Sequence, residues 1–240
     1  MSITVIDYGS GNLKSAAKAL ETAANNVNVS SKILVTSDPK IIKQSDKIVL
    51  PGQGSFGDCY SGIKKIPGLN ETLNEFVLEK KKPFLGICIG MQLLATKGKE
   101  ITGNSDGLFR AVAVFFPVTD LLNLGKSSEN ANDGGPPRRF RKVFGIDPDD
   151  LNEWKRVGYE LSPIYHVDDQ TPPVLIIHGD EDNLVPIDQS ERFQEKAINN
   201  GAKVKLIRKK GKDHGWPTII LDMSTFARWF DRKLNINSND

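Results

Sequence analysis

The most constraining feature of this sequence is an apolar run that passes through two glycines into a helical segment. Residues 84–91 read FLGICIGM, so Cys88 lies between Gly86 and Gly90. A strand that turns sharply into a helix is crowded on both sides of the turn, which favours glycine there, and it exposes the central residue. The segment therefore predicts a strand of a parallel sheet, a nucleophile elbow with cysteine at its tip, and a helix.

Six other runs of apolar or β-branched residues are typical of strands, and helical segments lie between them. The predicted strands are Ile3–Ile6, Lys32–Val35, Lys47–Leu50, Ala111–Phe116, Val174–Ile177 and Lys203–Ile207. Strands that alternate with helices favour a parallel sheet with right-handed crossovers. We therefore predict an α/β fold with a single doubly wound, mostly parallel sheet of about seven strands.

The length and linker composition favour a single domain. The chain has 240 residues, which is an ordinary to large size for one domain. No linker is rich enough in Pro, Gly or Ser to separate two domains, so we predict one α/β domain over residues 1–240. Residues 118–167 have the composition of loops with one short helix through Trp154. We expect this insertion to form a lid or cap beside the sheet.

Composition argues against several classes of partner. Lys and Arg number 32 and Asp and Glu number 30. The resulting net charge of +2 does not by itself indicate a nucleic-acid-binding protein. No apolar stretch approaches a membrane helix, and no signal peptide is visible, so we expect a cytoplasmic protein with reduced thiols. No His, Cys, Asp and Glu group has metal-ligand spacing, and no P-loop is present. We expect no cofactor, no metal, no nucleic acid and no membrane partner.

Two later residues complete a candidate catalytic set with Cys88. Asp182 follows the predicted strand Val174–Ile177, and His214 follows the predicted strand Lys203–Ile207. The carboxyl ends of parallel strands form the face where ligands bind. The order cysteine, aspartate, histidine along the chain is that of the α/β-hydrolase triad. We predict that Cys88 is the nucleophile, His214 the base and Asp182 the acid.

A glycine-rich turn is a candidate for the oxyanion hole. The turn LPGQGSF follows the predicted strand Lys47–Leu50 and carries Gly52 and Gly54. Backbone N–H groups of Gly52 or Gly54, together with the amide of Ile89 after the nucleophile, would stabilise an oxyanion. His166, His178 and Cys59 are expected to be structural; we expect His178 to bond locally and Cys59 to be a small buried side chain.

Residues 1–108 resemble a known family. The segments DYGSGNL, LPGQGSF and PFLGICIGMQLL, at residues 7–13, 50–56 and 83–94, resemble the glutaminase subunit of imidazole glycerol phosphate synthase, a class I glutamine amidotransferase. The resemblance implies a flavodoxin-like half in which Cys88 accepts the glutamyl group. That family completes its triad with a late His-x-Glu motif, which this sequence lacks.

Residues 110–234 resemble a different family. The segments AVAVFFPVTD, SPI, PPVLIIHGDEDNLVP and DHGW resemble the C-terminal half of α/β-hydrolase esterases of the carboxylesterase, lipase and feruloyl-esterase-like type. The resemblance implies that Asp182 and His214 are the triad acid and base. The chain is thus similar to a hybrid joined near Leu108, with an amidotransferase-like half, 1–108, and a hydrolase-like half, 109–234.

The two resemblances imply a strand order. From edge to edge it is 32–35, 3–6, 47–50, 84–87, 111–116, 174–177 and 203–207, with the elbow strand in the middle and buried on both faces. The fold expected is α/β-hydrolase-like.

The function predicted is a carboxylic ester hydrolase for short acyl esters. Cys88, His214 and Asp182 would form a covalent acyl-enzyme, a set of residue types that also resembles dienelactone hydrolases, and the insertion 118–167 would shape the acyl pocket. The partner expected is a small-molecule ester. One alternative is a glutamine amidotransferase or glutaminase with a synthase partner. Another is a folded hybrid without catalytic activity.

Overall fold

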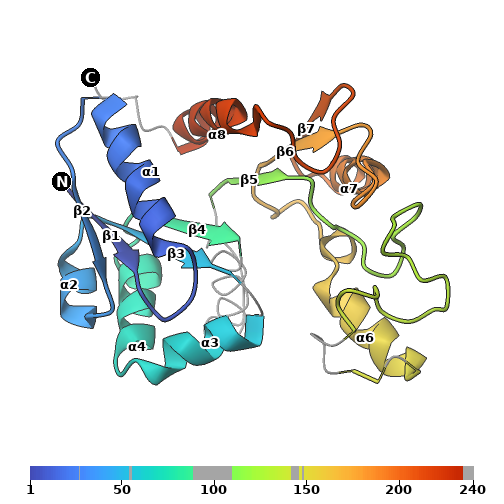
Figure 1. Ribbon diagram of the computed structural model, residues 1–240, viewed down its shortest axis with the longest axis horizontal. Helices are drawn as coiled ribbons and strands as arrows, with labels where there is room; N and C mark the ends of the chain where they lie inside the picture. Colours follow the sequence, from blue (N-terminus) through green and yellow to red (C-terminus); the bar gives the residue numbers. More distant parts are fainter. Residues whose placement is uncertain (27, 54–55, 89–109, 142–145, 148, 235–240) are drawn as a thin grey trace. The chain divides into compact units, whose positions relative to one another are not determined.

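The structure, a computed structural model, consists of two compact units. It describes residues 1–26, 28–53, 56–88, 110–141, 146–147 and 149–234. Unit 1 comprises Met1–Leu108 and unit 2 comprises Phe109–Asp240 (Figure 1). The boundary coincides with the predicted junction of the two halves near Leu108.

Unit 1 is a four-stranded parallel sheet with helices. Its elements are β1 (Ser2–Ile6), α1 (Leu13–Asn26), β2 (Lys32–Thr36), α2 (Pro39–Gln44), β3 (Lys47–Gly52), α3 (Phe56–Lys65), α4 (Leu69–Asn74), a π-helical turn (Glu75–Glu79) and β4 (Phe84–Cys88). The strand order is β2-β1-β3-β4, and every pair is parallel. Right-handed crossovers put α1 on one face and α2 and α4 on the other, where α2 and α4 contact each other.

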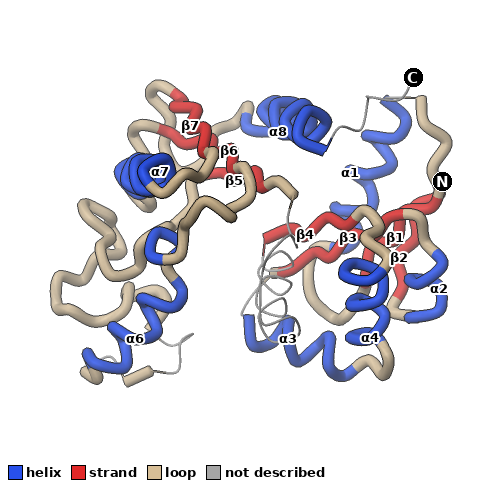
Figure 2. Tube along the Cα trace, turned by 180° about the vertical axis from the view of Figure 1, so that it is seen from behind, coloured by secondary structure: helices blue, strands red, loops and turns tan. Residues whose placement is uncertain are grey.

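Unit 2 has a three-stranded parallel sheet. Its elements are β5 (Val112–Phe115), α6 (Leu151–Leu161), a short 3-10 helix (Pro163–Tyr165), β6 (Val174–Gly179), α7 (Asp188–Asn199), β7 (Val204–Lys209) and α8 (Ile219–Leu234). The order is β5-β6-β7. Figures 1 and 2 show α7 and α8 on opposite sides of these strands.

The alternation of side chains along β6 builds a core on each face of this sheet. Val174 and Ile176 pack with Phe193 of α7, whereas Leu175 and Ile177 pack with residues of α8 and with Trp216. Every residue of β6 is buried, as its unbroken apolar run predicts. The central strand of unit 2 is thereby fixed rigidly, and the loop that follows it begins from a well-defined point.

The seven predicted strands are all present, and their order within each half is confirmed. Within the described residues the strands form a four-stranded sheet in unit 1 and a three-stranded sheet in unit 2, and one continuous sheet through both units stays a prediction. The structure differs from the prediction that the elbow strand is buried on both faces: Leu85 and Ile87 of β4 are 42% and 41% exposed, and β5 is half-buried. Within its own unit each of these strands is the last of its sheet, so fewer elements of that unit cover it than cover a central strand.

The helices of the described part of the chain are short or amphipathic. None of them is both long and apolar enough to cross a lipid bilayer.

Candidate active site

A hydrogen-bonded pair, Asp182 and His214, forms the centre of the candidate site in unit 2. The Nδ1 atom of His214 lies 2.9 Å from Oδ2 of Asp182. The side chain of Asp182 is fully buried, whereas that of His214 is 31% exposed. A carboxylate of this kind is shielded from water while the imidazole that it orients remains accessible to a substrate.

The topology of the sheet brings these two residues together. Strands β6 and β7 are parallel neighbours, so the loops that follow them meet at the same edge. The N–H of Glu181 donates to the carbonyl of Lys212 (3.0 Å), and the N–H of Asn183 donates to Oδ1 of Asp213 (3.1 Å). These cross-loop bonds fix the acid loop against the histidine loop.

The loop itself aims the carboxylate of Asp182. Its Oδ1 atom accepts the N–H groups of Leu184 (3.0 Å) and Val185 (2.8 Å), so that Oδ2 is directed at His214. An ionised carboxylate only accepts hydrogen bonds, so the proton of the contact is on Nδ1 of His214. In the neutral ring, Nε2 then carries the lone pair, which is the state that a general base needs.

The ring of Phe116 lies against the imidazole of His214. The ring centroids are 4.2 Å apart and the planes are inclined by 50°. Phe116 follows β5 with a φ of +34°, and its N–H donates to the carbonyl of Ile177 (3.1 Å). A bulky residue in this region costs on the order of 1–3 kcal/mol, and such strain concentrates at functional sites.

A cavity of about 380 Å³ opens beside His214. Its lining is mainly apolar: Phe115, Phe116, Val118, Leu124, Ser127, Glu129, Pro137, Arg139, Phe140, Leu184, Val185, Pro186, Gln189 and His214. Glu129 and Arg139 form an ion pair (3.0 Å), and Ser127 donates to the carbonyl of Leu184, so these polar groups have partners within the protein. About half of the lining comes from the insertion 118–167. Cavities of this volume hold small organic ligands.

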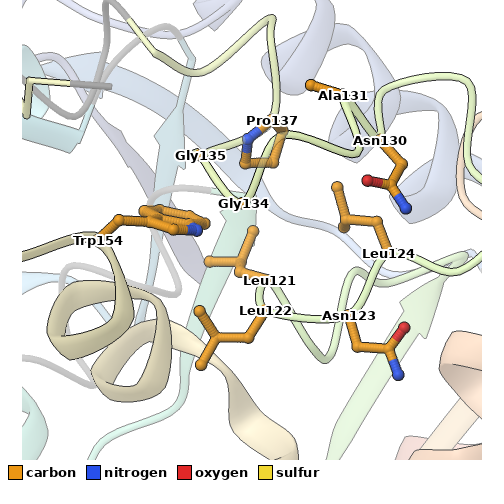
Figure 3. A pocket seen from close by; sticks show the side chains of 10 residues that line it. All are labelled: Leu121, Leu122, Asn123, Leu124, Asn130, Ala131, Gly134, Gly135, Pro137 and Trp154. Carbon is orange, nitrogen blue, oxygen red and sulfur yellow. The ribbon is translucent and has the colours of Figure 1, made fainter. Parts of the chain in front are cut away.

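A second, smaller cavity lies within the insertion. Its volume is about 120 Å³, and Figure 3 shows the indole of Trp154, carried by α6, directed toward the loop with Leu121 and Gly134. Leu124 and Pro137 line both cavities, so the two cavities adjoin at these side chains. Space of this size suits a few water molecules.

A buried polar network ties the base of the insertion to α7. The side-chain oxygen of Gln189 accepts the N–H groups of Thr119 (3.1 Å) and Asp120 (2.9 Å). Arg192 donates to Oδ2 of Asp120 (2.7 Å) and to the carbonyl of Asn123 (2.7 Å). Because Asn123 precedes Leu124, this network fixes the start of the cavity wall.

The candidate residues of unit 1 lie at the ends of β3 and β4. Gly52 and Cys88 are the last residues of these strands and lie opposite each other in the parallel register. Gly54 and Ile89 lie outside the described residues, and the structure describes only the backbone of Cys88. Their roles as nucleophile and oxyanion donors stay predictions.

The residues predicted to be structural are internally bonded. His178 has no exposed surface and contacts Ser190 and the carbonyl of Val185 (2.7 Å each), and burial lowers its pKa. Nε2 of His166 lies 2.9 Å from the carbonyl oxygen of Tyr159. Cys59 is fully buried. The local bonding of His178 and the burial of Cys59 are confirmed, and a structural role for His166 stays a prediction.

Sequence reasoning missed three contributors to the site: Phe116, Asp120 and Gln189. The dipeptide Phe116-Pro117 at the end of an apolar run was a weak signal for Phe116. The polar contacts of Gln189 join residues about 70 positions apart, which no local pattern reveals. Within the part of the chain that the structure describes, no group of three or more His, Cys, Asp or Glu side chains is placed to hold a metal ion.

The two halves of the chain are similar to different known proteins. The imidazole glycerol phosphate synthase subunit HisH of Rhodopseudomonas palustris is 53% identical over 108 residues, which are 45% of this chain and 50% of that protein. The subunit of the same name from Rhodospirillum rubrum is 51% identical over 133 residues, 53% of this chain and 62% of that protein. The chain thus spans about half the length of the curated relatives that it matches.

The family profile described as BD-FAE matches residues 85–197. Its match begins in β4 and overlaps the amidotransferase-like half.

Solved structures with this fold include hydrolases. A truncated carbohydrate esterase from gut microbiota aligns with a TM-score of 0.51 and 18% identity, covering 97% of this chain and 86% of that chain. An acetyl ester-xyloside bifunctional hydrolase from Caldicellulosiruptor lactoaceticus aligns with a TM-score of 0.53 and 14% identity, covering 97% and 83%. The fold is therefore α/β and α/β-hydrolase-like. The chain is a hybrid in which one part is similar to HisH subunits and the rest is similar to esterases.

Proposed function

We propose that this protein is a carboxylic ester hydrolase for short acyl esters. His214 acts as the general base, Asp182 orients it, and Cys88 is the nucleophile. The observation that carries the proposal is the 2.9 Å contact between Asp182 and His214 beside an apolar cavity that His214 itself lines. The BD-FAE match over residues 85–197 supports the same reaction class.

In the proposed reaction, Nε2 of His214 takes the thiol proton as the sulfur of Cys88 attacks the acyl carbon. The tetrahedral oxyanion accepts hydrogen bonds from the amide of Ile89 and that of Gly52 or Gly54. His214 then gives its proton to the departing alcohol, which leaves a thioester. A water activated by His214 attacks the thioester, the carboxylic acid departs, and the thiol is restored.

Asp182 serves both halves of this cycle. It keeps the proton of the neutral imidazole on Nδ1 and stabilises the imidazolium that forms when Nε2 takes up a proton. The apolar walls of the cavity favour the acyl chain over water, since burying apolar surface is favourable by about 25 cal/mol per Å².

A second candidate function is glutamine amidotransferase or glutaminase activity. The 53% identity with a HisH subunit over 108 residues favours it. In that case Cys88 would accept a glutamyl group and the reaction would release ammonia, with a synthase subunit as partner. The third candidate, a hybrid without activity, predicts neither product.

One set of assays separates these candidates. Release of p-nitrophenol from acetyl, butyryl and hexanoyl esters is measured beside ammonia release from glutamine. We expect ester hydrolysis by the wild type, a loss of several orders of magnitude in Cys88→Ala and His214→Ala, and a loss of about a thousandfold or more in Asp182→Asn. An asparagine amide at this position favours the wrong imidazole tautomer.

The matched controls are His166→Ala and Cys59→Ser, which change the same residue types outside the proposed triad. Both should keep ester hydrolysis near the wild-type rate. Wild-type hydrolysis by Cys88→Ala would overturn the proposal, and ammonia release that depends on Cys88 would favour the amidotransferase instead.

A further inference from the structure

His178 is a buried imidazole beside the candidate site that the proposed reaction does not use. It is the next-to-last residue of β6, and neither it nor Ser190 has exposed surface. Its Nε2 atom lies 2.7 Å from the carbonyl oxygen of Val185, and its Nδ1 atom lies 2.7 Å from the hydroxyl of Ser190.

The partner of Nε2 and the burial of the ring together indicate where its hydrogen lies. A carbonyl oxygen only accepts, so Nε2 donates to Val185, whereas the hydroxyl of Ser190 can pair with Nδ1 as donor or as acceptor. Burial favours the neutral ring, since it lowers the pKa of His178 because the charged form loses its hydration, and in the neutral ring Nδ1 accepts the hydroxyl hydrogen of Ser190.

Val185 links this ring to the acid of the site. Its carbonyl accepts from His178, while its N–H donates to Oδ1 of Asp182 (2.8 Å). Oδ2 of the same carboxylate contacts Nδ1 of His214 and lies 3.4 Å from Nε2 of His178. One chain of contacts thus runs from Ser190 through His178, Val185 and Asp182 to His214.

We propose that His178 is a positioning residue, which holds the loop Asp182–Val185 on β6 and thereby aims the Asp182 carboxylate at Nδ1 of His214. The expected effect on kcat rests on the proposed hydrolase function. The expected effect on the tautomer of His214 does not depend on that function. Without the bond to Val185, the loop keeps its bonds to the histidine loop but loses the anchor that ties Val185, a donor to the Asp182 carboxylate, to β6.

Two amide substitutions isolate this bond. In His178→Gln, the amide nitrogen lies near the place of Nε2 and can still donate to Val185. In His178→Asn, the shorter amide lies near the place of Nδ1, so it can pair with Ser190 but does not reach Val185. Both variants are polar and neutral, so the comparison separates the reach of the donor from the polarity of the side chain.

The first readout does not need enzymatic activity. Nitrogen-15 NMR of the imidazole rings reports which nitrogen of His214 carries the proton, and the chain has only three histidines to assign. We expect the Nδ1-protonated tautomer of His214 in the wild type and in His178→Gln. In His178→Asn this tautomer should lose population, because the carboxylate no longer faces Nδ1.

The second readout is the kinetics of p-nitrophenyl ester hydrolysis. A misplacement on the order of 1 Å costs about a hundredfold in rate, so kcat should fall by about that factor in His178→Asn with KM nearly unchanged. His178→Gln should restore kcat to within a few-fold. The Asp182→Asn variant serves as the reference for complete loss of orientation.

The outcomes separate the two hypotheses. A folded His178→Asn with the wild-type tautomer of His214 overturns the positioning role. A changed tautomer without ester hydrolysis by any variant, the wild type included, supports the positioning role and overturns the proposed function.

If His178→Asn does not fold, Ser190→Ala provides the test, since it removes only the bond that orients the ring. A partial loss of the same tautomer supports the proposal, and an unchanged spectrum overturns it.

Discussion

Gly179 lies so close to the carbonyl group of Lys212 that no side chain fits between them. A Cβ atom at Gly179 would be 2.1 Å from the carbonyl oxygen and 2.7 Å from the carbonyl carbon of Lys212. Both atoms belong to the backbone of the loop that carries His214. The distance between β6 and this loop, and with it the contact between Asp182 and His214, therefore depends on a glycine at this position.

The first prediction concerns this close approach. Gly179→Ala should destabilise unit 2 by about 3 kcal/mol or more, because the backbone of the histidine loop must move. Urea unfolding followed by tryptophan fluorescence measures this, since all three tryptophans, Trp154, Trp216 and Trp229, belong to unit 2.

Gly215→Ala is the matched control for that glycine. Gly215 has a φ of +86° and open space around its Cα, so alanine there costs only backbone strain of about 1 kcal/mol. Equal stability of Gly179→Ala and wild type would contradict the packing of the two loops.

The second prediction concerns the anchor of the insertion. Arg192→Met leaves the carboxylate of Asp120, whose side chain is 5% exposed, without its ion-pair partner. We expect a loss of about 2 kcal/mol in the free energy of unfolding, since an unpaired buried charge is costly and backbone N–H groups still bond to Asp120. KM for esters should rise, because Asn123 and the adjoining cavity wall lose their support.

Arg208→Met is the control for this change, since it removes an exposed ion pair with Glu191. Side chains that are 52% and 43% exposed gain little from pairing, so this loss should stay below about 1 kcal/mol. Equal effects of the two arginine substitutions would refute the structural importance of the buried pair.

Much of the fold follows from local patterns. The run Val174–Ile177 predicted a strand buried on both faces, because apolar side chains in succession need cover on both sides of a sheet. Asp182 and His214 could be placed together because both follow strands of a parallel sheet, and the structure brings them into contact. Each inference used only neighbouring residues and the geometry of parallel strands.

The remainder depends on tertiary packing. The exposure of Leu85 and Ile87 depends on which elements cover β4, and strand periodicity carries no such information. The contact of Phe116 with His214 depends on a positive φ after β5, which is unusual for phenylalanine. The carbonyl of Val185 accepts from His178 only because the acid loop folds back over the end of β6.

The third prediction is a pH dependence of stability. Burial lowers the pKa of His178 below its ordinary value of 6.5. Below pH 6.5 the unfolded chain therefore binds a proton that the folded chain does not, so the free energy of unfolding falls as the pH falls. Above that pH both states are neutral at this position, and its contribution is constant.

His178→Gln removes the titrating group, so its stability should fall less steeply between about pH 6.5 and pH 5, by at most about 1.4 kcal/mol per pH unit. Urea unfolding at several pH values measures the two slopes. Carboxylates with a lowered pKa, such as Asp213 and Asp222, lose their contribution to the free energy of unfolding at still lower pH. This loss is the same in both proteins and therefore cancels when the two slopes are compared. Identical slopes would show that His178 is not a buried neutral imidazole.

The last prediction concerns the two thiols. Cys59 is fully buried, and its sulfur lies 3.2 Å from the hydroxyl oxygen of Ser10 and donates to the carbonyl of Gln53 (3.4 Å). A buried, bonded thiol is shielded from alkylating reagents, whereas the elbow sequence around Cys88 favours a thiolate at the start of a helix. Iodoacetamide near neutral pH should therefore modify Cys88 first, as read by peptide mapping. Cys59→Ser should keep the fast-reacting thiol and Cys88→Ala should lose it, and faster labelling of Cys59 would count against Cys88 as the nucleophile.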